Sequence, residues 1–152
     1  MKRILVLLAI VASVLAIATI LQRQMRRRAD QTTAQTAEIE ALEEWVESAE
    51  STHERVHARF MAGTHGGEAE QESLTRYQMC IAKARLASAK GDLGECEKWY
   101  KAAVDAAEKG VEAQQAAYDV GVVTLNSLLL RQQYRAEAKI KLSEARDRIT
   151  PS

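Results

Sequence analysis

The strongest constraint on the fold is a coiled-coil repeat in the first half of the chain. Seven positions follow one another at alternating steps of three and four residues: Ile39, Leu42, Val46, Ala49, His53, Val56 and Phe60. This spacing places them on one narrow stripe of a helix, as in a coiled-coil seam. Glutamates are frequent on the remaining faces. The pattern predicts a coiled-coil helix over residues 30–62 that needs a partner along one stripe.

Composition extends this prediction to the rest of the chain. One Pro, seven Gly and one Phe leave little material for the turns and strands of a sheet. Ala, Glu, Lys, Arg and Gln dominate after residue 30, which is typical of long helices and coiled coils. Small side chains let helices approach closely but cannot fill a thick core. We therefore predict an all-α fold, an elongated coiled-coil helical hairpin or bundle.

An apolar segment precedes this helical region. Residues 4–21 read ILVLLAIVASVLAIATIL, in which only Ser13 and Thr19 are polar. As a helix the segment would be about 27 Å long, close to the ~30 Å hydrocarbon thickness of a bilayer. A secretory signal is the alternative, since residues 16–18 offer a small-x-small cleavage site. Because the apolar run continues past that site and ends in QRQMRRR, we favour an uncleaved transmembrane anchor over residues 1–29.

The net charge of zero hides an asymmetry. Six of the 21 basic residues and none of the 21 acidic ones precede Asp30, so the chain from there onward carries a net charge of −6. This argues against nucleic-acid binding, which needs a clustered basic surface. By the positive-inside rule, the four Arg after the apolar segment favour a cytoplasmic C-terminus.

Glycine-containing segments divide the remaining chain. Residues 63–67 (GTHGG) predict a loop, because Gly lowers helix propensity and supplies positive-φ positions. A second helix should run from about Glu68 to Lys90. Gly91 can then cap it, and Asp92 can act as the N-cap of a third helix. The predicted seam of the second helix is Leu74, Tyr77, Ile81, Ala84 and Ser88.

The third helix carries two adjacent seams, which predicts that it packs closely on two neighbours. One seam is Trp99, Ala103, Ala106, Gly110, Ala113, Ala117 and Val120, and the other is Val104, Ala107, Val111, Gln114 and Tyr118.

The stretch AAYDVGVVTLNSLLLRQQ at residues 116–133 predicts a joint between two helices. Gly121 suits a left-handed cap, Val122 and Val123 favour extended backbone, and Thr124 can cap a fourth helix from Leu125 to about Ile149. Spacing leaves open whether the two helices form a hairpin or run end to end. The fourth helix has two predicted seams: Leu125, Leu129, Ala136 and Ile140, and Ala138, Leu142, Ala145 and Ile149. Residues predicted to shape the joint and its packing are Tyr118, Gly121, Thr124, Leu125, Leu128 and Leu129.

This joint resembles the outer-membrane efflux (TolC-like) family, in which a phrase of the form A..Y..G..T...LL.....AE..L..AR recurs. The matching positions are Ala117, Tyr118, Gly121, Thr124, Leu128, Leu129, Ala136, Glu137, Leu142, Ala145 and Arg146. The resemblance covers roughly residues 77–149. Because the chain has one such phrase and no alternating strand pattern, it implies a TolC-like helical hairpin region over residues 68–150 rather than an outer-membrane channel. It also implies a scaffold or an adaptor of an export assembly.

Residues 53–57 read HERVH, which matches the HExxH signature of zinc peptidases. In that reading His53 and His57 would bind Zn²⁺ and Glu54 would act as general base. A third ligand would be needed, from His65 or from an acid such as Glu72. The spacing of His65 does not match the three-His signature, Arg55 places a cation between the ligands, and His53 lies on the coiled-coil seam. We therefore predict ordinary helix histidines, with no catalytic residue, metal or cofactor.

Cys80 and Cys96 have neither a disulfide framework nor metal-site spacing around them. If the chain turns near residues 91–94, Cys96 should face Ser88 rather than Cys80. We predict two small semi-buried thiols.

These features predict a non-enzymatic, membrane-anchored coiled-coil protein in the cell envelope of a bacterium. It would act in scaffolding or in an efflux or export assembly through helix–helix contacts. The expected partners are membrane lipid, through residues 4–21, and another protein or a second copy of the chain, through the seams. The bulk of the chain is expected in the periplasm, or secreted if the N-terminal segment is cleaved. The alternatives are a small HExxH zinc-dependent hydrolase and a cytoplasm-facing coiled-coil adaptor.

Overall fold

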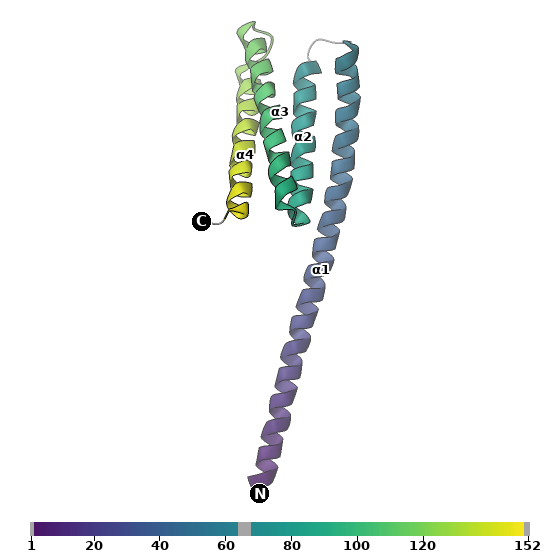
Figure 1. Ribbon diagram of the computed structural model, residues 1–152, viewed down its shortest axis with the longest axis vertical. Coiled ribbons are helices and arrows are strands. Elements are labelled where there is room, and N and C mark those ends of the chain that lie inside the picture. Colours follow the sequence, from purple (N-terminus) through teal and green to yellow (C-terminus); the bar gives the residue numbers. More distant parts are fainter. Residues whose placement is uncertain (1, 64–67, 151–152) are drawn as a thin grey trace. The chain divides into compact units, whose positions relative to one another are not determined.

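The computed structural model describes the backbone of residues 2–63 and 68–150, and the side chains of residues 31–63 and 69–150. Four helices follow one another: α1 (Lys2–Ala62), α2 (Glu68–Ala89), α3 (Leu93–Asp119) and α4 (Leu125–Ile149), as Figure 1 shows. No strand occurs among these described residues, which confirms the all-α prediction. The chain divides into two compact units, Met1–Glu38 and Ile39–Ser152.

The predicted transmembrane helix is not supported by the structure. Among the described residues, no helix combines the length and the apolar character needed to cross a membrane. The segment on which the prediction depends, residues 4–21, belongs to α1 but lies outside the residues whose side chains are described.

The α2–α3 joint is the turn that the sequence predicts. Gly91 has φ +77°, and its amide donates to Ser88 O at 3.1 Å while the amide of Asp92 donates to Ala87 O at 2.9 Å. This pair of bonds is a Schellman C-cap, which needs the left-handed conformation that glycine adopts without strain. The Asp92 carboxylate then accepts from the amide of Glu95 at 3.0 Å and caps α3.

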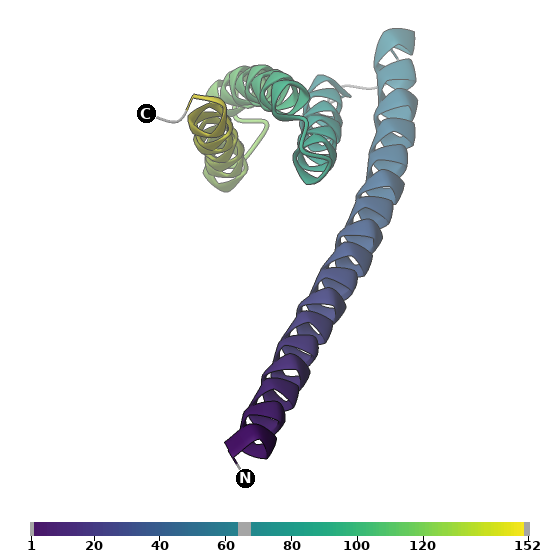
Figure 2. The same ribbon diagram turned by 60° about the horizontal axis from the view of Figure 1, so that its bottom comes forward.

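Helix α3 lies between α2 and α4 and packs on both, as Figures 1 and 2 show from two directions. The hydrophobic core is shared by these three helices and consists largely of alanine: Tyr77, Cys80, Ala84, Ala87, Cys96, Tyr100, Ala103, Val104, Ala106, Ala107, Ala138, Leu142 and Ala145. Both predicted seams of α3 are buried in their central parts, although Val120 at the end of one seam is 74% exposed. The packing of α4 on α3 decides the open question of the joint in favour of a hairpin.

A close approach of α2 and α3 explains the glycine inside α3. A Cβ atom at Gly110 would lie 3.2 Å from the hydroxyl oxygen of Ser73 on α2. The two small residues therefore let the helix axes approach closely at this level.

The predicted seam of α2 is only partly right. Tyr77 and Ala84 are buried, whereas Leu74, Ile81 and Ser88 are half-buried. The buried positions of α2 instead fall on two stripes: Ser73, Tyr77, Cys80, Ala84 and Ala87 on one, and Thr75 and Ala82 on the other. The reason is that α2 has neighbours on two sides, α3 and the part of α1 within the second unit, so the larger side chains between the stripes stay partly open.

The predicted seam of α1 lies on the less exposed side of the helix up to Val56, which is buried, but it is wrong at Phe60, which is 41% exposed. The earlier seam residues are all half-buried. Ion pairs connect this part of α1 to α2, among them Glu43 Oε1 to Lys90 Nζ at 2.7 Å and Glu50 to Lys83. Because both pairs are partly exposed to solvent, each contributes little to stability.

Candidate functional site

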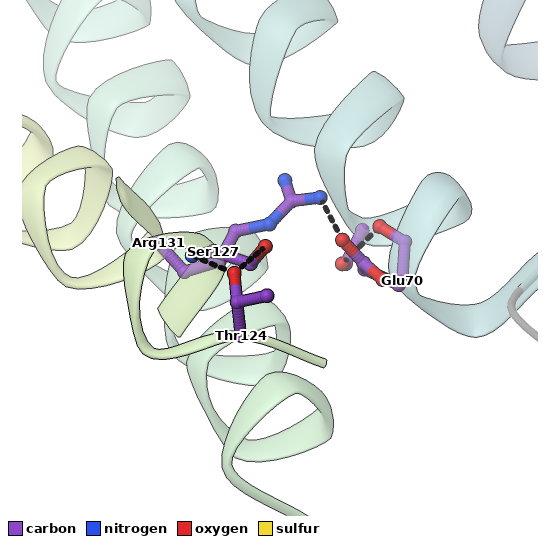
Figure 3. Close-up of polar contacts among 5 residues, drawn as sticks. Glu70, Thr124, Ser127 and Arg131 are labelled. Carbon is purple, nitrogen blue, oxygen red and sulfur yellow. Dashed lines mark hydrogen bonds and ion pairs between the residues drawn. The ribbon is translucent and has the colours of Figure 1, made fainter. Parts of the chain in front are cut away.

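The α3–α4 joint is built by the residues that the sequence singles out. Gly121 has φ +74°, and its amide donates to Tyr118 O while the amide of Val122 donates to Ala117 O, both at 2.9 Å. This is a second Schellman cap. Thr124 then begins α4: its hydroxyl accepts from the amide of Ser127 at 3.4 Å (Figure 3). The joint therefore reverses the chain within a few residues.

Of the apolar residues predicted to pack at this joint, one is buried. Leu128 is 4% exposed and lies in the interior. Tyr118, Leu125 and Leu129 are 38%, 51% and 50% exposed. The structure therefore assigns Leu128 to the core and leaves the other three side chains available to a partner.

A partly buried polar cluster lies near this joint, where α2, α3 and α4 meet. Arg131 Nη2 donates to Glu70 Oε1 at 2.7 Å, as Figure 3 shows. With its amide nitrogen facing the same carboxylate, Gln114 donates to Glu70 Oε1 at 2.9 Å and to Oε2 at 3.1 Å. Gln114 is only 1% exposed. One carboxylate of α2 thus receives one donor from α3 and one from α4.

The cluster fixes the three helices relative to one another. A buried amide without a partner would cost about 1–3 kcal/mol, so Gln114 is tolerated only where Glu70 meets it. Each of the three side chains comes from a different helix, and a shift of any helix by one residue would break the contacts. The sequence pattern predicts Gln114 on a seam but does not predict its partners, because Glu and Arg are too abundant in this chain to single out two of them. A long polar residue on an otherwise small, apolar stripe was the available signal.

Two tyrosines close the core beside this cluster. The rings of Tyr77 on α2 and Tyr134 on α4 stack with their centroids 5.3 Å apart. Burial raises the pKa of Tyr77 to about 12, and the negative charge of Glu137 acts in the same direction. The phenol is therefore neutral at physiological pH and serves to pack α2 against α4.

Helix α4 has a second apolar stripe, which the rest of the described chain leaves uncovered. We call Leu125, Leu129, Ala136 and Ile140 the outer stripe. Its three large side chains are 51%, 50% and 59% exposed, and Ala136 is also exposed. The buried stripe of the same helix, formed by Leu128, Ala138, Leu142 and Ala145, lies on nearly the opposite side of the helix. The sequence predicts both stripes as seams. The structure buries one of them, but the prediction is wrong at its last residue, Ile149, which is 40% exposed.

The HERVH histidines lie at the contact between α1 and α2. His53 is half-buried with Nδ1 3.2 Å from the hydroxyl of Thr75. His57 is exposed with Nδ1 3.6 Å from a carboxylate oxygen of Glu72. Burial lowers the pKa of His53 from its usual value, and the positive charge that His57 can carry acts in the same direction. No three His, Cys, Asp or Glu side chains among the described residues are grouped so that they could hold a metal ion. His65 lies outside the described residues.

Both cysteines are free and buried. Burial raises the pKa of the Cys80 and Cys96 thiols, which keeps them protonated and unreactive. The side chain of Ser88 forms a hydrogen bond with Cys96, so the predicted facing of these two residues across the α2–α3 joint is confirmed.

Comparison with known proteins finds no family model, curated protein or solved structure that matches this chain. The resemblance to the outer-membrane efflux family therefore depends only on the sequence pattern of residues 77–149 and stays a prediction.

Proposed function

We propose that this protein is a non-enzymatic helical scaffold of the bacterial cell envelope, anchored in the membrane by residues 4–21. It would join a larger assembly, such as an efflux or export complex, through helix–helix contacts made by α4. The observation that carries this proposal is the outer stripe, an apolar row at helical spacing that stays exposed after the other stripe of α4 has been buried.

The arrangement of these exposed apolar side chains along one side of α4, rather than their number, favours a binding surface. Single exposed apolar residues are normal on protein surfaces, whereas several aligned on one stripe of a helix suit a binding surface. Within the outer stripe, Gln132 and Gln133 lie between Leu129 and Ala136. Full burial of a Leu or Ile side chain contributes about 1.5–3 kcal/mol. Three such side chains at about half exposure would therefore supply several kcal/mol to a partner helix. The Glu70–Gln114–Arg131 cluster connects α4 to α2 and α3 and so helps to fix the orientation of the row before binding.

The membrane part of the proposal depends on the sequence. The apolar run at residues 4–21 is followed by four Arg between residues 23 and 28, which suits an anchor with flanking positive charge. The family resemblance favours a periplasmic location for the helical unit, and the flanking charge favours the cytoplasm. A reporter enzyme fused after the C-terminus, active on only one side of the membrane, separates the envelope scaffold from the cytoplasm-facing adaptor.

Site-specific photo-crosslinking of the full chain in bacterial membranes tests the contact surface. A photoreactive residue at Leu129 should give discrete crosslinked products in the membrane fraction. The same residue at Glu112, which is exposed on α3, should not. Equal labelling from both positions, or none from Leu129, would contradict a docking role for α4.

The zinc hydrolase is retained as a second candidate because Glu72 approaches His57, which brings a carboxylate to the HERVH pair. Metal analysis of the purified full chain separates the two functions. The scaffold should contain no stoichiometric zinc. One zinc per chain that is lost in His53→Ala would favour the hydrolase.

A further inference from the structure

We propose that the outer stripe binds the outer stripe of a second copy of this chain, with the two α4 helices antiparallel about a two-fold axis near Gln132 and Gln133. This inference rests on the proposed function and names the partner that the scaffold surface fits.

The residue spacing of the outer stripe is symmetric about a point between Gln132 and Gln133. In an antiparallel pair related by a two-fold axis, residues at equal distances on either side of the axis face each other. Leu125 and Ile140 share a midpoint between Gln132 and Gln133, and Leu129 and Ala136 share the same midpoint. The stripe is therefore self-complementary: Leu125 would meet the second copy's Ile140, and Leu129 would meet its Ala136.

The second argument is the match of sizes and polar groups. A large Leu129 facing a small Ala136 lets the two helices approach closely without leaving a gap. The Gln132 and Gln133 amides near the axis can each donate and accept, so they can bond to the same residues of the second copy. In a parallel pair, by contrast, Ala136 would face Ala136 and Leu129 would face Leu129, and the two surfaces would fit less evenly.

The third argument is electrostatic. Glu137 would lie nine residues along the helix direction from its own copy, about 13 Å, which exceeds the ~8 Å screening length at physiological salt. Lys139 would lie still farther from its copy, and it already pairs with Glu108 at 2.8 Å. The charges that flank the stripe most closely, Glu137 and Lys139, therefore lie beyond the screening length from their own copies in the antiparallel pair.

The outer face of α1 offers no comparable partner. Glu40, Glu44 and Ser51 are exposed there, and these polar side chains would leave the outer stripe unmatched.

The dimer should be weak, because a single helix pair buries less area than the roughly 1,000 Å² of a stable interface. The dissociation constant should lie in the micromolar range or above, and the dimer should form where the chains are concentrated in a membrane.

Cysteine cross-linking of the full chain in membranes tests this geometry. Gln133→Cys lies next to the axis and should form a disulfide with its own copy on mild oxidation. Leu125→Cys alone should not, because its copy would lie fifteen residues away along the helix, about 22 Å, whereas bridged Cα atoms lie within about 7 Å. Differently tagged Leu125→Cys and Ile140→Cys chains should cross-link when mixed. The native thiols are buried, and Glu112→Cys on α3 controls for random collision.

A second variant tests the energetic role of the stripe. In the Gln133→Cys chain, Leu129→Asp should reduce cross-linking at least tenfold, and helix content measured by circular dichroism should be unchanged. Ile149→Asp is the matched control, because Ile149 is 40% exposed on α4 but outside the outer stripe, and it should leave cross-linking unchanged.

Two results would overturn the inference. Efficient self-cross-linking of Leu125→Cys would show a parallel pair. Absence of cross-linking from Gln133→Cys, together with photo-crosslinking of Leu129 to a different protein, would show that another partner occupies the stripe. The second result would leave the proposed scaffold function intact, so the two failures can be told apart.

Discussion

Gln114 occupies a position on α3 where the two preceding turns place Ala107 and Val111 on the same buried stripe. Its amide is accommodated because both carboxylate oxygens of Glu70 accept from its nitrogen. The nature of the group at this position should therefore matter more than its size. Gln114→Met keeps the volume and removes the donors, while Gln114→Glu keeps the shape and places a second carboxylate against Glu70.

We expect Gln114→Glu to lower the free energy of unfolding at pH 7 by on the order of 3 kcal/mol, because a buried like charge faces Glu70. Gln114→Met should cost about 1 kcal/mol, for the lost hydrogen bonds. The new carboxyl has its pKa raised in the folded state, so the deficit of Gln114→Glu should shrink as the pH falls from 7 to 5. Urea unfolding followed by circular dichroism measures this, and equal losses in the two variants at pH 7 would contradict the argument.

Gly121 is a second residue whose role can be tested alone. A Cβ atom there would meet nothing within 4 Å, so any cost of substitution comes from the backbone and not from a clash. With φ at +74°, Gly121→Val should destabilise the protein by about 1–2 kcal/mol. Gly121→Asn should cost less, because Asn tolerates the left-handed conformation. The thermal unfolding midpoints of the two variants test this prediction. Equal midpoints for Gly121→Val and the wild type would contradict the role of Gly121 as a left-handed helix cap.

At the scale of the helices, the sequence predicted where each helix ends better than which side of each helix is buried. Gly91 with Asp92, and Gly121 with Thr124, mark helix ends by local chemistry, since a left-handed glycine and a side-chain acceptor are needed wherever the rest of the molecule lies. The buried face of a helix depends instead on how many neighbours cover it. Helix α2 is covered by both α3 and α1, so its buried positions lie on either side of Leu74 and Ile81 rather than at them. Periodicity alone could not show this.

The contact between α1 and α2 should weaken in acid because of His53. Burial lowers the pKa of this residue below about 6.5; His57 and Arg76 act in the same direction, and Glu72 and Glu54 oppose it. A depressed pKa means that the folded state favours neutral His53. Its contribution to stability is therefore complete above pH 6.5 and is lost as the pH falls through the lower folded-state value.

Accordingly, the urea midpoint of the wild-type chain should fall more between pH 7.5 and pH 5 than that of His53→Gln, in which this titration is absent. Carboxylates titrate in both chains over this range, so the difference between the two pH dependences isolates His53. Parallel pH dependences would show that His53 is not buried at the contact.

At the scale of the whole molecule, the sequence could not assign neighbours. It identified seams that need partners, but both stripes of α4 had the same periodicity, and only the structure separates the buried one, with Leu142, from the exposed one, with Leu129. The sequence did not predict the Glu70–Gln114–Arg131 cluster for the same reason, because its members are far apart in the sequence and of common residue types. Pairing between helices is a property of the tertiary arrangement, and no local rule encodes it.

The core cluster contains none of the described residues of α1, so the hairpin of α3 and α4 together with α2 should fold without that helix. Removing residues 1–67 uncovers Thr75 and Ala82 on α2 and abolishes exposed ion pairs that contribute roughly 0–1 kcal/mol each. We expect residues 68–152 to retain their helices and one cooperative thermal transition at a lower midpoint. Leu142→Ala in this shortened chain should cost a further ~2–4 kcal/mol, because it empties a packed core position. If the shortened chain is unfolded at neutral pH, or if Leu142→Ala leaves its midpoint unchanged, then the alanine-rich contacts of α3 do not suffice to hold three helices together.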